Sequence, residues 1–196
     1  MAINEHEFLV IERDNRGIGV DDPAGANVVG SKRVYRIDVR GATDIAALVL
    51  PADGNLAGAG ITPVAKSGLF IDLAADTVLP NGKIAEKWEG LAIGPRLKDG
   101  GYLILAGNDN DYSVTQNAAT SVQFDVYVDF KGNNVQRDLD QPTMLNGQVV
   151  GPVPAGFSLL PGVLHAYRAS AADLAGYVRP GKHDGHHGAD DDDDDD

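Results

Sequence analysis

The sequence contains no cysteine among its 196 residues. This absence excludes a disulfide framework and a zinc site built on thiolates. No stretch reaches the roughly 18 consecutive apolar residues of a membrane-spanning helix. Basic residues are few, since Lys and Arg number 16 against 29 Asp and Glu. The chain therefore lacks the basic stripe of a nucleic-acid-binding protein.

Several catalytic and metal-binding motifs are also missing. No G-x-S-x-G sequence occurs, so a serine nucleophile elbow is not supported. His6-Glu7 lacks the second histidine of the zinc-protease motif. Gly17-Ile18-Gly19 lacks the third glycine of a dinucleotide-binding loop. The run Asp109-Asn110-Asp111 lacks the glycine that an EF-hand loop needs.

The composition favours one turn-rich β domain, because 24 glycines and 10 prolines accompany 43% hydrophobic residues. The formal net charge is −13, but residues 1–180 carry only 15 basic and 21 acidic side chains, a net of −6. We expect a domain over residues 1–180 and a disordered His- and Asp-rich tail over residues 181–196. Its histidines (His183, His186 and His187) could bind a metal, although histidines in such tails are more often incidental.

The stretch from Trp88 to Asp111 contains two short apolar runs, Leu91–Ile93 and Tyr102–Ala106, separated by Gly- and Pro-rich turns. This pattern predicts a β-hairpin. Because both runs are continuous rather than alternating, we expect both faces of the hairpin to be buried. Trp88 is interpreted as a packing anchor in preference to a ligand platform.

Further strands are predicted from apolar or alternating runs. They are Phe8–Ile11, Arg33–Val39 with Tyr35, Ile37 and Val39 on one face, Val122–Phe130 and Leu164–Ala169, with weaker candidates at Ala46–Leu50 and Leu69–Leu73. Thr43–Leu48 is equally compatible with a helical turn. Lys131–Gly162 is expected to be a long connection, and Ala171–Tyr177 a helical turn with Ser170 as its N-cap.

Two segments of the chain have similar sequences. FLVIERDNR and YLILAGNDND are both apolar strands that open into charged and amide residues, and each is followed by an alternating strand. A buried strand followed by a half-exposed one, twice, favours successive blades of a β-propeller, with a β-sandwich as the alternative. Because the first strand begins almost at Met1, we expect an incomplete propeller that lacks an N-terminal part. Its open strand edges could support self-association.

The segments ERDNRG, EKWEGLAIGP and YLILAGNDND resemble the esterase-like phytase family over about Asn4 to Arg179. The resemblance implies the C-terminal portion of a bacterial phytase-like β-propeller domain that hydrolyses phosphoric or carboxylic esters. It also implies a periplasmic or extracellular location, although no signal peptide is visible in this chain.

Polar residues at the ends of the predicted strands are the candidate site. We expect Glu12, Arg13 and Glu89 to be catalytic, and Asp14, Asn108, Asp109 and Asp111 to bind Ca²⁺, a hard cation that takes oxygen ligands. Arg13 and Arg16 could bind phosphate oxygens. The competing interpretation is structural, because Asp and Asn after strands often make turns and Glu12–Asp14 could form local ion pairs.

Two functions are compatible with this pattern. The first is calcium-dependent hydrolysis of a phosphorylated or ester-bearing small molecule, with a metal-polarised water as nucleophile and an arginine stabilising the developing charge. The second is a non-catalytic β-propeller that acts as a binding or scaffold module, since one fold hosts many functions.

Overall fold

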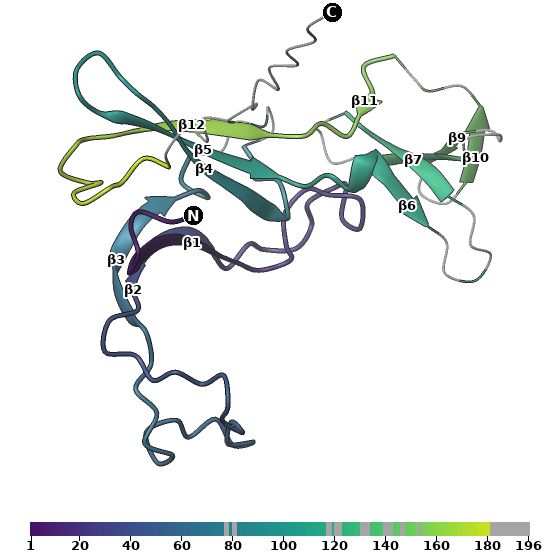
Figure 1. The fold of residues 1–196 in the computed structure, drawn as a ribbon. Coiled ribbons are helices and arrows are strands. Elements are labelled where there is room, and N and C mark those ends of the chain that lie inside the picture. Colours follow the sequence, from purple (N-terminus) through teal and green to yellow (C-terminus); the bar gives the residue numbers. More distant parts are fainter. Residues whose placement is uncertain are drawn as a thin grey trace, which may run out of the picture.

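The computed structural model describes residues 1–76, 79, 82–116, 119, 123–129, 134–138, 143–145, 148–151, 153 and 155–180. The strands assemble into three small antiparallel sheets (Figure 1). The first sheet is β1 (Glu7–Arg13), β2 (Lys32–Asp38) and β3 (Ala65–Asp72), and the second is β4 (Trp88–Arg96), β5 (Tyr102–Asn108) and β12 (Leu164–Ala169). The third contains β6 (Val114–Gln116), β7 (Gln123–Val128), β8 (Asn134–Asp138), β9 (Thr143–Leu145), β10 (Gln148–Gly151) and β11 (Ser158–Leu159).

The prediction of an all-β fold of antiparallel blades is confirmed, and among the described strands no sheet closes into a barrel. The predicted hairpin is β4 and β5, paired with Leu91 opposite Ala106. The predicted strand Leu164–Ala169 is β12, which adds to the other side of β5. The tail at residues 181–196 lies outside the described part of the chain.

The prediction that the two similar segments, FLVIERDNR and YLILAGNDND, each begin an equivalent pair of strands is wrong. β1 pairs with the following alternating strand β2, as expected, but β5 and β7 belong to different sheets. β1 is also an edge strand, whereas β5 is central. Similar sequences therefore occupy different positions, because the position of a strand depends on its partners more than on its own apolar run.

Some local predictions also need correction. The sequence predicts a hairpin that is buried on both faces. β4 is an edge strand in which Glu89 and Ala92 are exposed, so this prediction describes β5 better than β4. Residues 46–50 form no strand, while 69–72 belong to β3. The connection predicted over 131–162 contains β8 to β11, whose lengths of two to five residues are too short to give a periodic signal.

The inward face of β2 is the opposite of the predicted one. Lys32 and Val34 are fully buried, whereas Tyr35 and Ile37 are only partly covered. The Lys66 ammonium lies 4.4 Å from the centre of the Tyr35 ring on this outer face. Lys32 can occupy the buried face of β2 because Asp14, from another part of the sequence, compensates its charge. The buried face therefore cannot be read from the apolar residues of β2 alone.

The main core joins the first two sheets. Residues from β1, β2, β4, β5 and β12 contribute, with Leu9, Val34, Trp88 and Ile104 almost fully buried. Trp88 also donates its indole N–H to the Ala85 carbonyl at 2.9 Å, so the predicted packing role is confirmed. A second, smaller core lies under the third sheet and contains Val126 and Val128 of β7.

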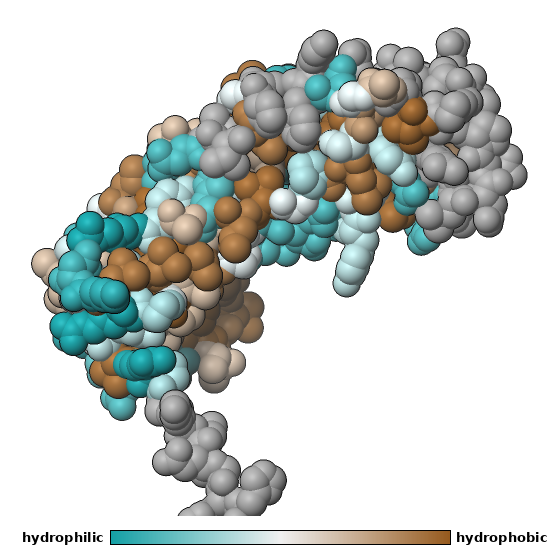
Figure 2. All heavy atoms as spheres, turned by 90° about the horizontal axis from the view of Figure 1, so that it is seen from above, coloured by the Kyte–Doolittle hydropathy of each residue, from teal (hydrophilic) through white to brown (hydrophobic). Residues whose placement is uncertain are grey.

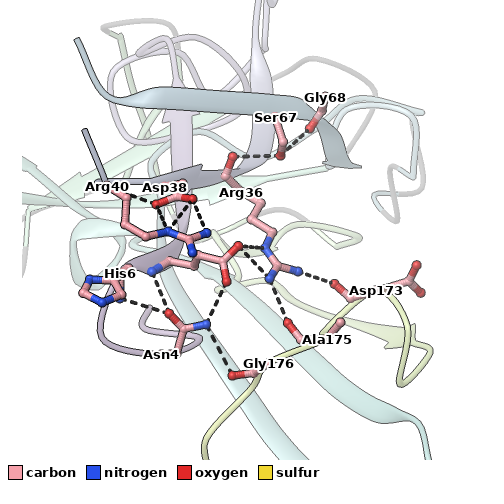
Figure 3. Close-up of polar contacts among 11 residues, drawn as sticks. Asn4, His6, Arg36, Asp38, Arg40, Ser67, Gly68, Asp173, Ala175 and Gly176 are labelled. Atoms are coloured by element: carbon pink, nitrogen blue, oxygen red, sulfur yellow. Dashed lines mark hydrogen bonds and ion pairs between the residues drawn. The ribbon is translucent and has the colours of Figure 1, made fainter. Parts of the chain in front are cut away.

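A clasp formed by residues 170–178 ties the segment after β12 to the N-terminal sheet (Figure 3). Ser170 and Asp173 exchange reciprocal hydrogen bonds of 2.7 and 3.1 Å in the manner of a cap, although the segment forms turns and not the expected helical turn. Arg36 donates to the carbonyls of Asp173 at 3.1 Å and Ala175 at 2.8 Å. Its guanidinium also pairs with Glu7 at 2.8 Å.

The loop between β2 and β3 projects from the body as an arm of residues 41–64 (Figure 1). Thr43 and Thr62 close its stem, through a backbone bond of 2.9 Å and a bond of 2.8 Å to the Thr43 hydroxyl. Beyond the stem four large apolar residues are exposed, namely Ile45, Leu48, Val49 and Leu50. Hydrophobic residues also reach the surface along the body seen from above (Figure 2).

The clasp predicts that Arg36 contributes far more to stability than a neighbouring arginine. Arg36→Ala should lower the free energy of unfolding by about 2–4 kcal/mol, because two carbonyls and a carboxylate lose a charged donor. Arg40→Ala is the matched control, since Arg40 is 63% exposed and pairs locally with Asp38; it should cost less than about 1 kcal/mol. Urea titrations of both variants measure the difference, and equal losses would contradict the clasp.

Candidate functional site

A pocket of about 460 Å³ lies where β1 meets β4. Apolar side chains, including Leu9, Ile11 and Leu91, form part of its wall, and Arg13 and Glu89 supply the charged side chains. Since β1 and β4 belong to different sheets, the pocket opens at the junction of the two sheets.

Arg13 and Glu89 form an ion pair across this junction. The Arg13 guanidinium also donates to the side-chain oxygen of Asn15. Glu89 has 49% of its side chain exposed and Arg13 has 21%, so solvent and a small ligand reach both groups. The structure thus brings together two of the three residues predicted to be catalytic.

Glu12 does not join them. Side chains alternate along a strand, so Glu12 points away from the face that carries Arg13. Its carboxylate binds the Lys66 ammonium of β3 at 2.9 and 3.0 Å. Arg16, the other predicted phosphate ligand, donates to the Val28 carbonyl at 2.8 Å.

Asp14 is the centre of a different arrangement. Its carboxylate accepts the backbone N–H groups of Gly30 at 2.5 Å, Ser31 at 3.1 Å and Arg16 at 3.1 Å. The buried ammonium of Lys32 lies 3.1 Å from the same carboxylate and donates to the Asp14 carbonyl at 2.7 Å. These bonds fix the loop after β1 against the start of β2.

Burial raises the pKa of Asp14. The hydrogen bonds from Gly30 and Arg16 and the Lys32 ammonium together lower it by more, so that the pKa is about 2. Burial lowers the pKa of Lys32, and Asp14 opposes this shift by stabilising the charged ammonium. The two groups therefore depend on each other, with Lys32 buried and Asp14 25% exposed, and the bonds leave Asp14 few free lone pairs for a metal.

The predicted ligands after β5 are also engaged. The Asn108 side-chain oxygen accepts the Val163 N–H at 2.6 Å. Asp109 accepts the backbone N–H of Asp111 at 2.9 Å, and Asp111 pairs with the Lys87 ammonium. The structural interpretation of this run, in which its side chains bind its own backbone and neighbouring strands, accounts for these contacts.

The same segment forms a left-handed turn (η1, Asp111–Ser113) in which three successive non-glycine residues have positive φ, with values of 49°, 56° and 61°. Lys87, which pairs with Asp111, has φ 46°. Left-handed geometry costs about 1–2 kcal/mol for each such residue. Asn110 and Ser113 hold the turn by donating to the Leu160 carbonyl at 3.1 and 2.6 Å.

The sequence analysis missed the charged pair before the hairpin, Glu86 and Lys87. Glu86 is buried, and its carboxylate accepts the Val20 N–H at 3.2 Å. Burial raises the pKa of Glu86, while Lys87 opposes this rise. The pairing of Lys87 with Asp111 raises the pKa of Lys87. The sequence signal available was their place at the start of the segment EKWEGLAIGP, since Gly19, which gives Glu86 its space, lies far away in the chain.

These contacts do not fit a calcium ion. In the described part of the chain no group of three or more His, Asp or Glu side chains could hold a metal. Asp14 and Asp111 face ammonium groups, and Asn108 and Asp109 satisfy backbone donors. A cation would have to compete with all of these partners.

Comparison with known families identifies the domain. Residues 1–112, more than half of the chain, match the family model described as "Phytase-like: Esterase-like activity of phytase". The chain belongs to the phytase-like family. The matched region contains β1 to β5 and thus the whole Arg13–Glu89 pocket. No curated protein and no solved structure matches the chain.

The Asp14–Lys32 pair gives the phytase-like domain a defined acid response. Because the pKa of Asp14 is about 2 when folded and 3.8 ordinarily, its stabilising effect is complete above pH 3.8 and is lost as the pH falls towards 2. Asp14→Ala should lower the free energy of unfolding by about 3–5 kcal/mol at neutral pH, because Lys32 is left buried and unpaired.

The matched control removes both charges. The double variant Asp14→Asn with Lys32→Met should recover much of the stability lost in Asp14→Ala, since no buried charge remains. Guanidinium unfolding of the three proteins at neutral pH measures these values. A double variant at least as unstable as Asp14→Ala would argue against a buried ion pair.

Proposed function

We propose that the phytase-like domain hydrolyses a phosphorylated or ester-bearing small molecule in the pocket between β1 and β4. The observation that supports this proposal most is the Arg13–Glu89 pair, which places a cation and a carboxylate at an accessible junction of two sheets. The match of residues 1–112 to the phytase-like family supports it independently.

Each side chain has a defined task in this proposal. The planar guanidinium of Arg13 suits phosphoryl or carboxylate oxygens, which would replace Glu89 as its partner. Glu89, once released, accepts a proton from a water molecule whose oxygen attacks the phosphorus or carbonyl carbon. The alcohol leaves with a proton from solvent. The apolar wall contributed by Leu9, Ile11 and Leu91 would contact the organic part of the substrate.

The proposal predicts that Arg13→Ala and Glu89→Gln each lower kcat/KM by about 100-fold or more, because the first removes a positioned cation and the second a positioned proton acceptor. A generic phosphomonoester and a generic carboxylic ester are the substrates. Arg168→Ala is the control, because it also breaks an exposed ion pair, with Asp99, outside the pocket. Glu12→Gln tests the remaining catalytic prediction and should be nearly silent if Glu12 serves only Lys66.

The same assay tests calcium dependence. Because the predicted calcium ligands already bind other groups of the protein, we expect the activity and the melting temperature to be the same in millimolar Ca²⁺ and in a chelator. A rise in melting temperature with Ca²⁺ would support the sequence-based prediction, because a ligand that binds only the folded state stabilises it. Absence of turnover with both substrates, at wild-type folding, would refute the hydrolase proposal.

A second candidate function rests on the projecting arm of residues 41–64. Five large apolar residues of this loop are exposed (Ile45, Leu48, Val49, Leu50 and Val64), which is characteristic of an interaction surface. Between Arg40 and Lys66 the arm contains Asp44 and Asp53 but no basic residue, which disfavours an anionic membrane. In the described part of the chain no helix is both long and apolar enough to span a bilayer. We therefore propose self-association of the domain through its arms as the scaffold alternative.

Self-association predicts a mass that rises with concentration in light scattering. Leu48→Asp and Val49→Asp should each reduce it to the monomer mass, because a buried charge opposes the contact. Val28→Asp is the matched control, since Val28 is 79% exposed but lies outside the arm. A monomer at all concentrations would reject this candidate and leave the hydrolase proposal unaffected.

A further inference from the structure

A buried histidine packs against the single tryptophan of the chain. His165 of β12 is 5% exposed, and its ring centre lies 4.5 Å from that of Trp88, with the planes tilted by 57°. The Nδ1 atom lies 2.8 Å from the Tyr167 hydroxyl. The Nε2 atom is buried and has no hydrogen-bond partner in the described part of the chain.

A neutral imidazole is compatible with this environment, whereas an imidazolium is not. The Tyr167 hydroxyl satisfies Nδ1, and only one polar atom remains without a partner. Protonation gives the ring two N–H donors and a positive charge. The second donor and the charge would then be enclosed beside Trp88, which costs free energy because Nε2 has no hydrogen-bond partner among the described residues.

Among the described residues, few charged or titratable groups lie around His165. Burial lowers the pKa of His165, and Asp76, which follows β3, partly opposes this shift. Burial raises the pKa of Tyr167 to about 12, with Asp76 and Asp72 adding to the rise, so Tyr167 stays a neutral hydroxyl. On β5 the residue opposite His165 is Ala106, which has no charge. Trp88 is the contact from β4.

One side of this arrangement is open. A pocket of about 410 Å³ is lined by Asp76, His165, Tyr167 and Arg168, among others. Arg168 is held by Asp99 on the β4–β5 loop. A protonated ring that left Trp88 would therefore find the exposed carboxylate of Asp76 in the same pocket.

The elements that hold His165 also carry the candidate site. Trp88 separates Lys87 from Glu89 at the start of β4. At the start of β12, Val163 exchanges two hydrogen bonds with Asn108, of 2.6 and 3.1 Å. Displacement of the His165 ring would thus act on both strands at the end of the hairpin.

We propose that His165 is an acid-sensitive element that locks β12 onto Trp88 when neutral and releases it when protonated. On release the ring moves toward Asp76, and the end of the hairpin loosens. The acid response stands independently of the proposed hydrolysis, whereas its effect on activity rests on that proposal.

The sign of the response follows from the burial of His165. Its pKa is lower in the folded chain than the ordinary 6.5, so the unfolded chain binds the proton first as the pH falls. Stability should therefore decrease as the pH drops below 6.5, and this contribution should stop changing once the folded pKa is passed.

Trp88 reports the event directly, because it is the only tryptophan and departure of the imidazole from its ring changes the surroundings of the indole. In the full chain, the fluorescence of Trp88 should change in a single titration with a midpoint below 6.5. His165→Gln should abolish the titration, while His6→Gln, at an exposed position, should preserve it. Unchanged titration in His165→Gln would overturn the proposal.

Asp76→Asn provides a test that does not remove the histidine. Because Asp76 is exposed, the variant should fold, and loss of its carboxylate should move the midpoint to lower pH. A midpoint that stays fixed or moves upward would contradict the assigned partner. If the ring signals of His165 in NMR titrate at or above 6.5, the lock does not exist. If the wild-type protein shows the expected fluorescence titration but hydrolyses no ester, the lock is supported and the proposed function is rejected.

Discussion

The packing of Trp88 between the first two sheets is the contact on which most of the described structure depends. Its ring is 1% exposed in a core that draws on β1, β2, β5 and β12. A fully buried aromatic side chain removes a large apolar area from water, and such residues dominate the energetics of a small core. The flanking residues Lys87 and Glu89 are positioned as a consequence, because their neighbour cannot move without opening the core.

Charged groups then complete what the apolar core begins. Lys32 would be unfavourable on the inner face of β2, but Asp14 compensates it. Arg36 similarly donates to two carbonyls of the clasp, those of Asp173 and Ala175. Both contacts connect segments that are distant in the sequence, so the N-terminal sheet is held by long-range polar bonds as well as by apolar burial.

The candidate site is the place where local rules are most clearly broken. Four non-glycine residues, Lys87 and Asp111 to Ser113, have left-handed backbone geometry at the end of the β4–β5 hairpin. Such strain persists only where the surroundings impose it, and it is often found near functional sites. Here the Lys87–Asp111 pair and the bonds to the Leu160 carbonyl impose it. The pocket with Arg13 and Glu89 opens beside this rigid hairpin end.

The sequence by itself predicted the all-β fold class, the hairpin, and two residues, Arg13 and Glu89, that the structure brings together at one pocket. Local apolar runs and turn residues carry that information, because strand formation depends on side chains a few residues apart. Tertiary structure decided which strand became central, why Lys32 is buried, and which partners occupy Glu12, Asp14 and Asp111. It also decided that His165 meets Trp88. These outcomes depend on pairs separated by many residues, and the period of a single strand contains no record of its partner.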